Sequence, residues 1–431
     1  MDLFVKFKKD YFNYLISIIL PAFISGISIP LFKHILGAKG YGSFSIWFNA
    51  VLILTSTLSG WIAQSIILFY PTSTNKRSFS ARAINLSIRT QLFFFIPCFI
   101  LVWLISSDVL FGILFCIALL FTSLQFTILP IIQSGFLSKK IIFSELIRTV
   151  LYISVSLLLL KFSGLPTLYS LFIAVIVSYA ASLFYLVRQS SNFFENAKPE
   201  NGDEKKLKEF FIKFFNYGAP LSMWFVFSYL LSYIDKVFIL KNFGGEVQGN
   251  YQAIFDLLSK SIILIISPVI TSLFPILTSA YANGHKSEIR LLLKRIIFFE
   301  VTGFVVVSFL YWLFGAKLLF IILKIPDSIT FQWMGFIVIS ATFIWQIAIL
   351  VQKRFELKLR SVYLLLMVAI AFLFQVVFYL VFEKYHNQLL YPIGFLLSTF
   401  IYLLLISVSE LIALSKLISP RLSKIFDVTK L

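Results

Sequence analysis

Residues 210–257 read FFIKFFNYGAPLSMWFVFSYLLSYIDKVFILKNFGGEVQGNYQAIFDL, and the expected fold is built outward from this stretch. An apolar segment of membrane-spanning length carries Asp235 and Lys236 near its end. After a glycine-containing turn, a second apolar segment bears Asp256 and, just beyond the quoted stretch, Lys260. An ionised side chain at bilayer depth costs on the order of 2.5–3.5 kcal/mol or more, so it is normally held against a partner or a polar cavity. We therefore expect two consecutive membrane helices that carry a functional site.

The composition extends this expectation to the whole chain. Of the 431 residues, 59% are hydrophobic and only 13% are charged, and the mean hydropathy is +0.94. An ordinary soluble domain has roughly 25% charged residues. The sequence therefore predicts an all-α, polytopic membrane protein.

Several kinds of chemistry have no visible place in this sequence. Cys98 and Cys116 both lie in apolar runs, and with three scattered histidines they form neither a disulfide framework nor a metal spacing. The chain has no HExxH, GxxxxGK[ST] or GxSxG pattern, which argues against zinc proteases, nucleotide hydrolases and common serine hydrolases. We expect no metal, no cofactor and no enzyme activity.

Apolar segments of about 20 residues or more predict twelve transmembrane helices. They lie at about 11–36, 43–69, 83–106, 109–136, 143–162, 167–189, 212–240, 250–279, 291–314, 330–352, 361–383 and 391–415. An even number of spans places both termini on one side of the membrane.

The distribution of basic residues predicts which side that is. Of the 37 Lys and Arg residues, 28 fall in the termini, loops and adjoining helix ends that this scheme places on the cytoplasmic side. Positive residues concentrate on the cytoplasmic side of membrane proteins, so the sequence predicts an N-in, C-in topology. The same distribution explains the net charge of +18 as a topology signal and an attraction to anionic membrane lipids. A nucleic-acid partner is therefore not expected.

A polar linker divides the chain into two halves. Residues 190–209 are the longest polar stretch, between six-helix lobes at residues 1–189 and 210–431. Each lobe would begin in the same orientation, as in transporters whose repeats are related by an axis along the membrane normal. The ends of the two first helices also match, since Gly37 precedes a Tyr-Gly pair and Gly244 precedes Gly249 and a tyrosine. We expect the two lobes to surround a central cavity.

Lys260 is the leading candidate for a cavity charge. It lies near mid-depth of its helix, and Asp256 precedes it at the i,i+4 spacing that places both side chains on one face. An ammonium in a polar cavity would bind an anionic group. The alternative is a structural ion pair that joins this helix to a neighbour.

Four further charges are candidates. Asp235 should lie at a depth similar to that of Asp256 and share Lys260 or a cation, although Asp235-Lys236 would equally suit an interfacial pair. Arg89 and Arg148 lie near the cytoplasmic face and could bind phosphate bidentately or extend to the headgroups. Glu300 would line the cavity or pair with a neighbouring arginine. Asp235, Asp256 and Glu300 are the candidates for ion coupling.

Three stretches resemble polysaccharide flippases of the Wzx type. IPLFKHILGAKGYGSFSIW, Ile29–Trp47, looks like the first loop of these proteins, where a leucine-glycine pair precedes a tyrosine-glycine pair. Tyr217–Lys260 is similar to their seventh helix, with a proline near its start, an aspartate followed by a basic residue, and then a glycine before a tyrosine. Ile265–Tyr281 fits their eighth helix with its proline before the cytoplasmic loop.

The resemblance implies a member of the multidrug/oligosaccharidyl-lipid/polysaccharide exporter superfamily. Such a protein moves an undecaprenyl-pyrophosphate-linked oligosaccharide, such as the O-antigen repeat of lipopolysaccharide, between the leaflets of the bacterial inner (cytoplasmic) membrane by alternating access. The resemblance also implies a polysaccharide polymerase and a chain-length regulator as partners. Among the family's charged residues, only Asp235-Lys236 carries over to this sequence.

Three other functions stay open. A cation-coupled multidrug antiporter of the same superfamily would share the helix number and the two lobes. A membrane polysaccharide polymerase is disfavoured, because no long outer loop carries acids or arginines. A structural membrane scaffold would leave the intramembrane charges without a purpose.

Overall fold

The computed structural model describes residues 3–70, 73, 75–134, 138–189, 204–282, 286–357 and 360–414. The helices within these ranges are α1 (Leu3–Phe69), α2 (Lys76–Ser106), α3 (Val109–Ser134), α4 (Ser138–Phe162), α5 (Thr167–Gln189), α6 (Glu204–Ala282), α7 (Lys286–Leu323), α8 (Ile329–Leu357), α9 (Ser361–Phe382) and α10 (Leu390–Leu414), with a short 3₁₀ turn at Glu383–Tyr385. Ten helices in this described part are long and apolar enough to cross a membrane. The all-α, multi-pass membrane class is therefore confirmed.

Two of these helices are each sharply kinked at a single glycine. Gly37 in α1 has φ 68° and ψ 175°, and Gly244 in α6 has φ 81° and ψ 174°. Positive φ is accessible to glycine without steric cost, so one residue makes each break where the sequence predicted a longer loop. Counting the two arms of each kinked helix separately gives the twelve segments expected from the sequence. The number of membrane crossings itself stays a prediction.

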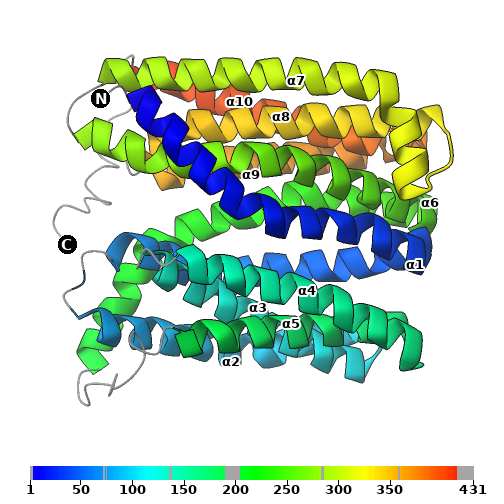
Figure 1. Cartoon of the computed structure of the whole chain (residues 1–431), viewed down its shortest axis with the longest axis horizontal. Helices are drawn as coiled ribbons and strands as arrows, with labels where there is room; N and C mark the ends of the chain where they lie inside the picture. Colours follow the sequence, from blue (N-terminus) through cyan, green and yellow to red (C-terminus); the bar gives the residue numbers. More distant parts are fainter. Residues whose placement is uncertain are drawn as a thin grey trace.

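The helices run roughly parallel in one elongated bundle (Figure 1). α1 begins and α10 ends at one end of the bundle, and both glycine kinks lie at the opposite end. We call this opposite end the kink end. The common position of the two helix termini agrees with an even number of passes.

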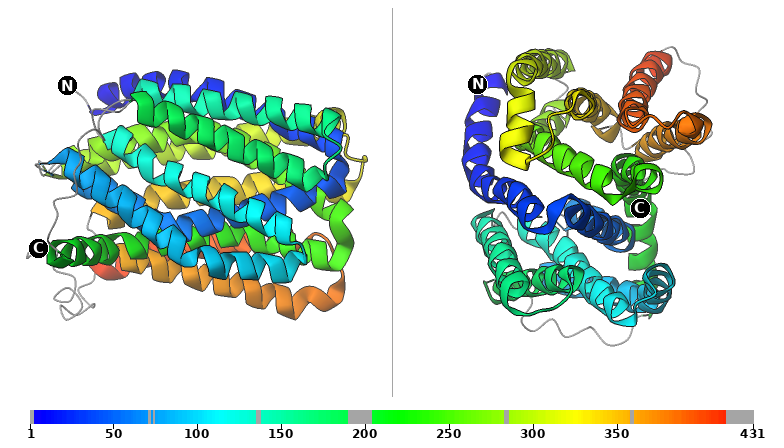
Figure 2. Two further views of the ribbon diagram at one scale, coloured as in Figure 1. Left: turned by 90° about the horizontal axis from the view of Figure 1, so that it is seen from below. Right: turned by 90° about the vertical axis from the view of Figure 1, so that its right-hand side faces the viewer.

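The contacts divide the helices into two groups, seen from the kink end in the right panel of Figure 2. Helices α2 to α5 pack on one another and on α1, whereas α7 to α10 pack on one another and on α6. The most extensive packing between the groups is α1 against α6, and α1 also contacts α7. The two kinked helices therefore join the first half of the chain to the second.

At the kink end, α1 and α6 approach so closely that side chains are excluded. A Cβ atom added at Gly249 would lie 1.8 Å from the backbone oxygen of Ala38, and one added at Gly42 would lie 2.9 Å from the Cα atom of Gly249. Gly42 and Gly249 follow the kinks at Gly37 and Gly244 by the same five positions. Positions at the same distance after the two kinks thus face each other.

A second contact joins α1 and α6 toward the end where the termini lie. The Ser65 hydroxyl donates a 2.8 Å hydrogen bond to the backbone oxygen of Phe214. Ser222 on α6 donates a 2.6 Å bond to the backbone oxygen of Ser56. Small side chains and these serine bonds permit close helix packing where the surroundings are apolar.

The outer surface of the bundle is rich in large apolar side chains. On α2 and α7 they include Phe93, Leu104, Phe298 and Trp312, each between 70% and 79% exposed. In the hydrocarbon of a membrane such a surface carries no hydrophobic penalty. One boundary differs from the sequence-based expectation, because α7 continues to Leu323 where a helix end near residue 314 was predicted.

Candidate functional site

Lys260 lies in the middle of the second arm of α6, fifteen residues after Gly245 in the sequence. At a rise of about 1.5 Å per residue, this places it roughly 22 Å along the arm. Its ammonium is 3.4 Å from a carboxylate oxygen of Asp256, and the lysine side chain is 58% exposed while that of Asp256 is 13% exposed. An ammonium that keeps this much exposure can bind an anion while its charge stays partly balanced.

Asp256 also connects the two halves of the chain. Its Oδ2 atom accepts a 2.6 Å hydrogen bond from the hydroxyl of Tyr41 on α1 and a 3.0 Å bond from Gln252 on its own helix. Because Asp256 and Lys260 share one helix face, Lys260 is directed toward the boundary that Tyr41 shares with α6. The pair therefore belongs to the interface between the halves.

Arg148 on α4 has its charge balanced within the first half. Its guanidinium donates to one carboxylate oxygen of Glu145 at 2.6 and 3.0 Å and lies over the ring of Tyr179, 5.1 Å from the ring centre. Gln125 on α3 donates to the other oxygen of Glu145 at 2.9 Å. These contacts fix the guanidinium, and the arginine side chain as a whole is 24% exposed.

Helix α1 provides an indirect connection between the helices that carry Arg148 and Lys260. Tyr152, one helical turn after Arg148 on α4, stacks on Phe44 of α1 with 6.4 Å between the ring centres. Tyr41, also on α1, donates to Asp256 on α6. Both α4 and the Lys260–Asp256 pair on α6 are thus linked to α1.

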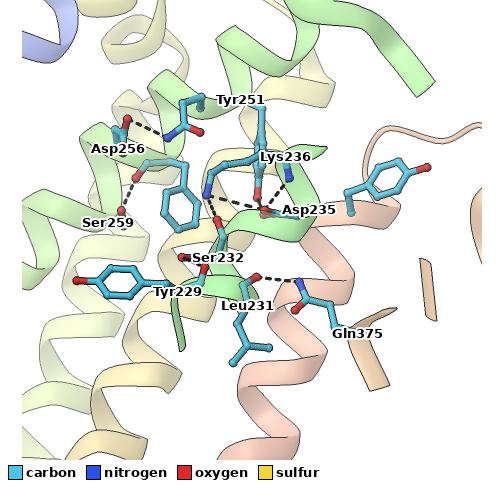
Figure 3. A network of polar contacts seen from close by, with 12 residues as sticks. Tyr229, Leu231, Ser232, Asp235, Lys236, Tyr251, Asp256, Ser259 and Gln375 are labelled. Atoms are coloured by element: carbon cyan, nitrogen blue, oxygen red, sulfur yellow. Dashed lines mark hydrogen bonds and ion pairs between the residues drawn. The ribbon is translucent and has the colours of Figure 1, made fainter. Parts of the chain in front are cut away.

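Asp235 and Lys236 form a different, fully buried arrangement in α6 (Figure 3). Their side chains are 0% and 2% exposed and their charged atoms are 3.8 Å apart. The ammonium also donates to the backbone oxygen of Ser232 and lies 3.5 Å from the ring centre of Phe255. Burial of both groups does not fit an interfacial pair, in which the ammonium would reach water.

The partners of Asp235 also differ from the expectation. Its Oδ2 accepts a 2.5 Å hydrogen bond from Tyr251 and its Oδ1 a 2.8 Å bond from the Lys236 amide. Asp256 is the acid that pairs with Lys260, so Asp235 and Asp256 have different lysine partners. The reason is the kink at Gly244, which folds Tyr251 back onto Asp235 at a separation of 16 residues.

Hydrogen bonds from α9 support the helix turn that precedes this pair. Gln375 donates a 3.0 Å hydrogen bond to the backbone oxygen of Leu231 and a 2.7 Å hydrogen bond to the hydroxyl of Tyr379. Tyr379 donates a 2.6 Å hydrogen bond to the backbone oxygen of Tyr391 on α10. The buried pair is therefore built into the packing of the second half.

Two candidates lie apart from these groups. Arg89 is exposed on α2, where it donates a 3.1 Å bond to Asn85, and no contact within the described ranges joins it to Arg148 or Lys260. Glu300 on α7 is 1% exposed, and neither carboxylate oxygen has a hydrogen-bond donor among the described residues. No trio of His, Cys, Asp or Glu side chains in the described part could hold a metal ion.

Lys33 is a cross-half contact that the sequence did not reveal. Its side chain is buried, and its ammonium donates to the backbone oxygens of Leu323 and Lys324, where α7 ends. A cation is favourable there, because the last carbonyl groups of a helix carry partial negative charge. Tyr41, Tyr152 and Lys33 were missed because the sequence shows their types but not their distant partners.

Comparisons with known proteins are consistent with this architecture. Residues 7–281 match the model of a family described as polysaccharide biosynthesis protein. No curated protein sequence gives a significant match.

Solved structures of membrane transporters share the fold. A multidrug resistance MATE family transporter of the MOP superfamily, in its inward-facing conformation, is similar with a TM-score of 0.71 at 12% identity, over 93% of this chain and 96% of that one. An outward-facing structure of a multidrug resistance MATE family transporter gives a TM-score of 0.70 at 11% identity, over 96% of this chain and 97% of that one. A Vibrio cholerae MATE transporter gives a TM-score of 0.67 at 11% identity, over 94% of this chain and 97% of that one.

Proposed function

Since the chain belongs to the polysaccharide biosynthesis protein family, we propose that it is a flippase that carries a lipid-linked oligosaccharide across the membrane. The substrate is an undecaprenyl-pyrophosphate-linked repeat unit, taken from the inner to the outer leaflet of the bacterial cytoplasmic membrane. The protein acts as a transporter and not as an enzyme. Both termini lie in the cytoplasm, and the kink end faces outward.

The observation that carries this proposal is the Lys260 side chain, which is 58% exposed midway along the second arm of α6 and pairs with Asp256, a residue in contact with α1. A pyrophosphate cannot enter hydrocarbon without compensating charge. Lys260 supplies a point charge, and Arg148 on α4 supplies a planar guanidinium suited to phosphate oxygens. The two cations come from different halves, so the anion would bridge them.

Transport follows from relative movement of the halves, residues 1–189 and 210–431. The sugar and pyrophosphate occupy a central cavity between them while the lipid tail stays in the bilayer. Moving one negative charge outward releases about 2.3 kcal/mol of free energy per 100 mV of inside-negative potential. The membrane potential therefore favours export of an uncompensated pyrophosphate.

The test is to delete the gene and locate the lipid-linked repeat unit. We expect the surface polysaccharide to be lost while the complete repeat unit accumulates on the cytoplasmic leaflet. Accumulation of single, unpolymerised units on the outer leaflet would instead identify the protein as a polymerase, and unchanged surface glycan would reject both functions.

A cation-coupled multidrug antiporter is the second candidate, favoured by the fold that the chain shares with multidrug transporters. Asp235, Asp256 and Glu300 would then bind the coupling cation. Efflux of small organic cations with intact surface glycan would establish this alternative. Interactions with a polysaccharide polymerase and a chain-length regulator would accompany the flippase only.

A further inference from the structure

A pocket of about 590 Å³ opens at the kink end, within the second half of the chain. Its walls come from the start of the second arm of α6, the link between α7 and α8 together with the first turn of α8, and the link between α9 and α10. These links lie at the end of the bundle away from the first and last helix termini (Figure 1). Protein ligand sites commonly have volumes of about 300–1,000 Å³. Lys260, Asp256 and Arg148 do not line this pocket.

Uncharged hydrogen-bonding groups dominate the lining. They are the amides of Asn250, Asn387 and Gln388 and the hydroxyls of Ser328 and Thr330. Amide and hydroxyl groups both donate and accept hydrogen bonds, and they come from all three walls. Such a set matches a ligand that carries several hydroxyl groups.

Phe331, His386 and Glu246 complete the chemistry of the lining. Phe331 presents a partly exposed ring, which can cover the apolar C–H face of a sugar. Glu246 is exposed and is the acidic member of the lining, His386 is its imidazole, and the lining contains no lysine or arginine. The charge of Lys33 interacts with Glu246, but the Lys33 ammonium is already bound by the carbonyl oxygens at the end of α7. An anionic ligand is therefore disfavoured.

Asn250 supplies an independent indication of a ligand. Its side chain is 4% exposed, and its amide oxygen accepts no hydrogen bond from the described residues. A buried acceptor without a donor is destabilising, because it has lost its hydrogen bonds to water. Because Asn250 lines the pocket, a hydrogen-bond donor of a bound ligand would satisfy this oxygen.

We propose that this pocket is a binding site for a neutral sugar at the outer face of the second half. The sugar hydroxyls bond the amides and hydroxyls of the lining, and one sugar face packs on Phe331. The identity of the ligand rests on the proposed function, since the sugar would belong to the glycan that reaches the outer leaflet. The pocket would thus hold the headgroup after transport, at a place separate from the charged site.

The proposal is tested with the full-length protein in lipid nanodiscs, using saturation-transfer NMR. The probes are four neutral disaccharides, namely maltose, lactose, N-acetyllactosamine and chitobiose, and one acidic sugar, sialyllactose. We expect at least one neutral probe to bind and sialyllactose to bind more weakly. The substitutions Phe331→Leu and Gln388→Ala should each lower the affinity for the neutral probe by about five- to tenfold. Such a decrease corresponds to the loss of one stacking or hydrogen-bonding contact.

Gln332→Ala is the matched control. Gln332 adjoins Phe331 in sequence and bonds Asp327 at 2.8 Å, but it does not line the pocket. Its substitution should leave sugar binding unchanged. Failure of every neutral probe to bind, or equal binding by the wild type, Phe331→Leu and Gln388→Ala proteins, would overturn the proposal.

The outcome is distinguishable from failure of the proposed function. The same nanodisc protein, reconstituted in vesicles with an undecaprenyl-linked glycan, reports flipping independently. Flipping without sugar binding would reject the pocket and keep the flippase. Sugar binding that depends on Phe331, without flipping, would keep the pocket and reject the flippase.

Discussion

The hydroxyl of Tyr41 on α1 donates a 2.6 Å hydrogen bond to the carboxylate of Asp256 on α6, across 215 positions of sequence. Asp256 also holds the Lys260 ammonium at 3.4 Å. One carboxylate therefore joins a contact between the halves to the cation proposed to bind substrate. An anion bound to Lys260 would compete with Asp256 for the ammonium. The Lys260–Asp256 ion pair, which lies beside the contact between the halves, would then be weakened.

Tyr41→Phe should loosen the kink end. The variant removes the donor to Asp256 but keeps the ring, and hydrogen bonds to charged groups contribute about 1.5–3 kcal/mol. We expect a shift of the distance distribution between spin labels placed on the kink-end parts of α1 and α6. Tyr385→Phe, which alters an exposed tyrosine at the same end, is the control. Identical distributions for wild type and Tyr41→Phe would show that this bond does not hold the halves together.

Lys260→Ala should abolish glycan export without lowering the amount of protein in the membrane. The side chain is 58% exposed, so its removal leaves little cavity, while the charge for pyrophosphate is lost. Lys260→Arg should keep part of the activity, because the charge remains although its geometry changes.

The double variant Asp256→Ala, Lys260→Ala separates this role from a structural one. If the pair only stabilises the fold, Lys260→Ala loses folded protein and the double variant recovers both abundance and export. Full export by the double variant, measured beside membrane abundance, would exclude Lys260 from the substrate site.

Lys236→Ala should behave in the opposite way. It leaves the Asp235 carboxylate buried at 0% exposure without its cation, and breaking a buried pair typically destabilises by about 3–5 kcal/mol. We expect a marked loss of folded protein, seen as aggregate that elutes early in size-exclusion chromatography and as a lower thermal transition temperature in detergent. The double variant Asp235→Asn, Lys236→Met should recover abundance. Normal abundance of Lys236→Ala would mean that water reaches this pair.

Gly249→Ala should disrupt the packing of α1 on α6. The added Cβ would lie 1.8 Å from the backbone oxygen of Ala38, which cannot move without its helix. Overpacking of this kind costs about 1–3 kcal/mol, so the thermal transition should fall. Gly26→Ala is the control, since a Cβ there meets nothing within 4 Å. Equal transitions for the two variants would show that the helices separate readily at this point.

Reporter fusions test the topology. Fusions after Ser107, Gly164, Gly245 and Asn387 should report the outside, and those after Asn75, Lys139, Asn201 and His285 the cytoplasm. Asn201 and His285 lie outside the described residues. An outside signal after Asn201 would contradict the division into two six-helix lobes.

The sequence by itself determined the class of the fold and the approximate extent of its helices. Long apolar runs fix membrane helices because every backbone polar group in hydrocarbon must be satisfied within the helix. The repeated glycine positions around Gly37 and Gly244 also disclosed the relation between the halves. These features are local, so they are readable one segment at a time.

Only the tertiary structure decided which charges meet. Asp235 and Asp256 look alike in sequence, yet one is buried with Lys236 and Tyr251 while the other faces Tyr41 and Lys260. A hydrogen bond between residues 215 positions apart leaves no periodic pattern in either segment. The partner of a side chain depends on how distant helices pack, and that is set by the summed contacts of the whole bundle.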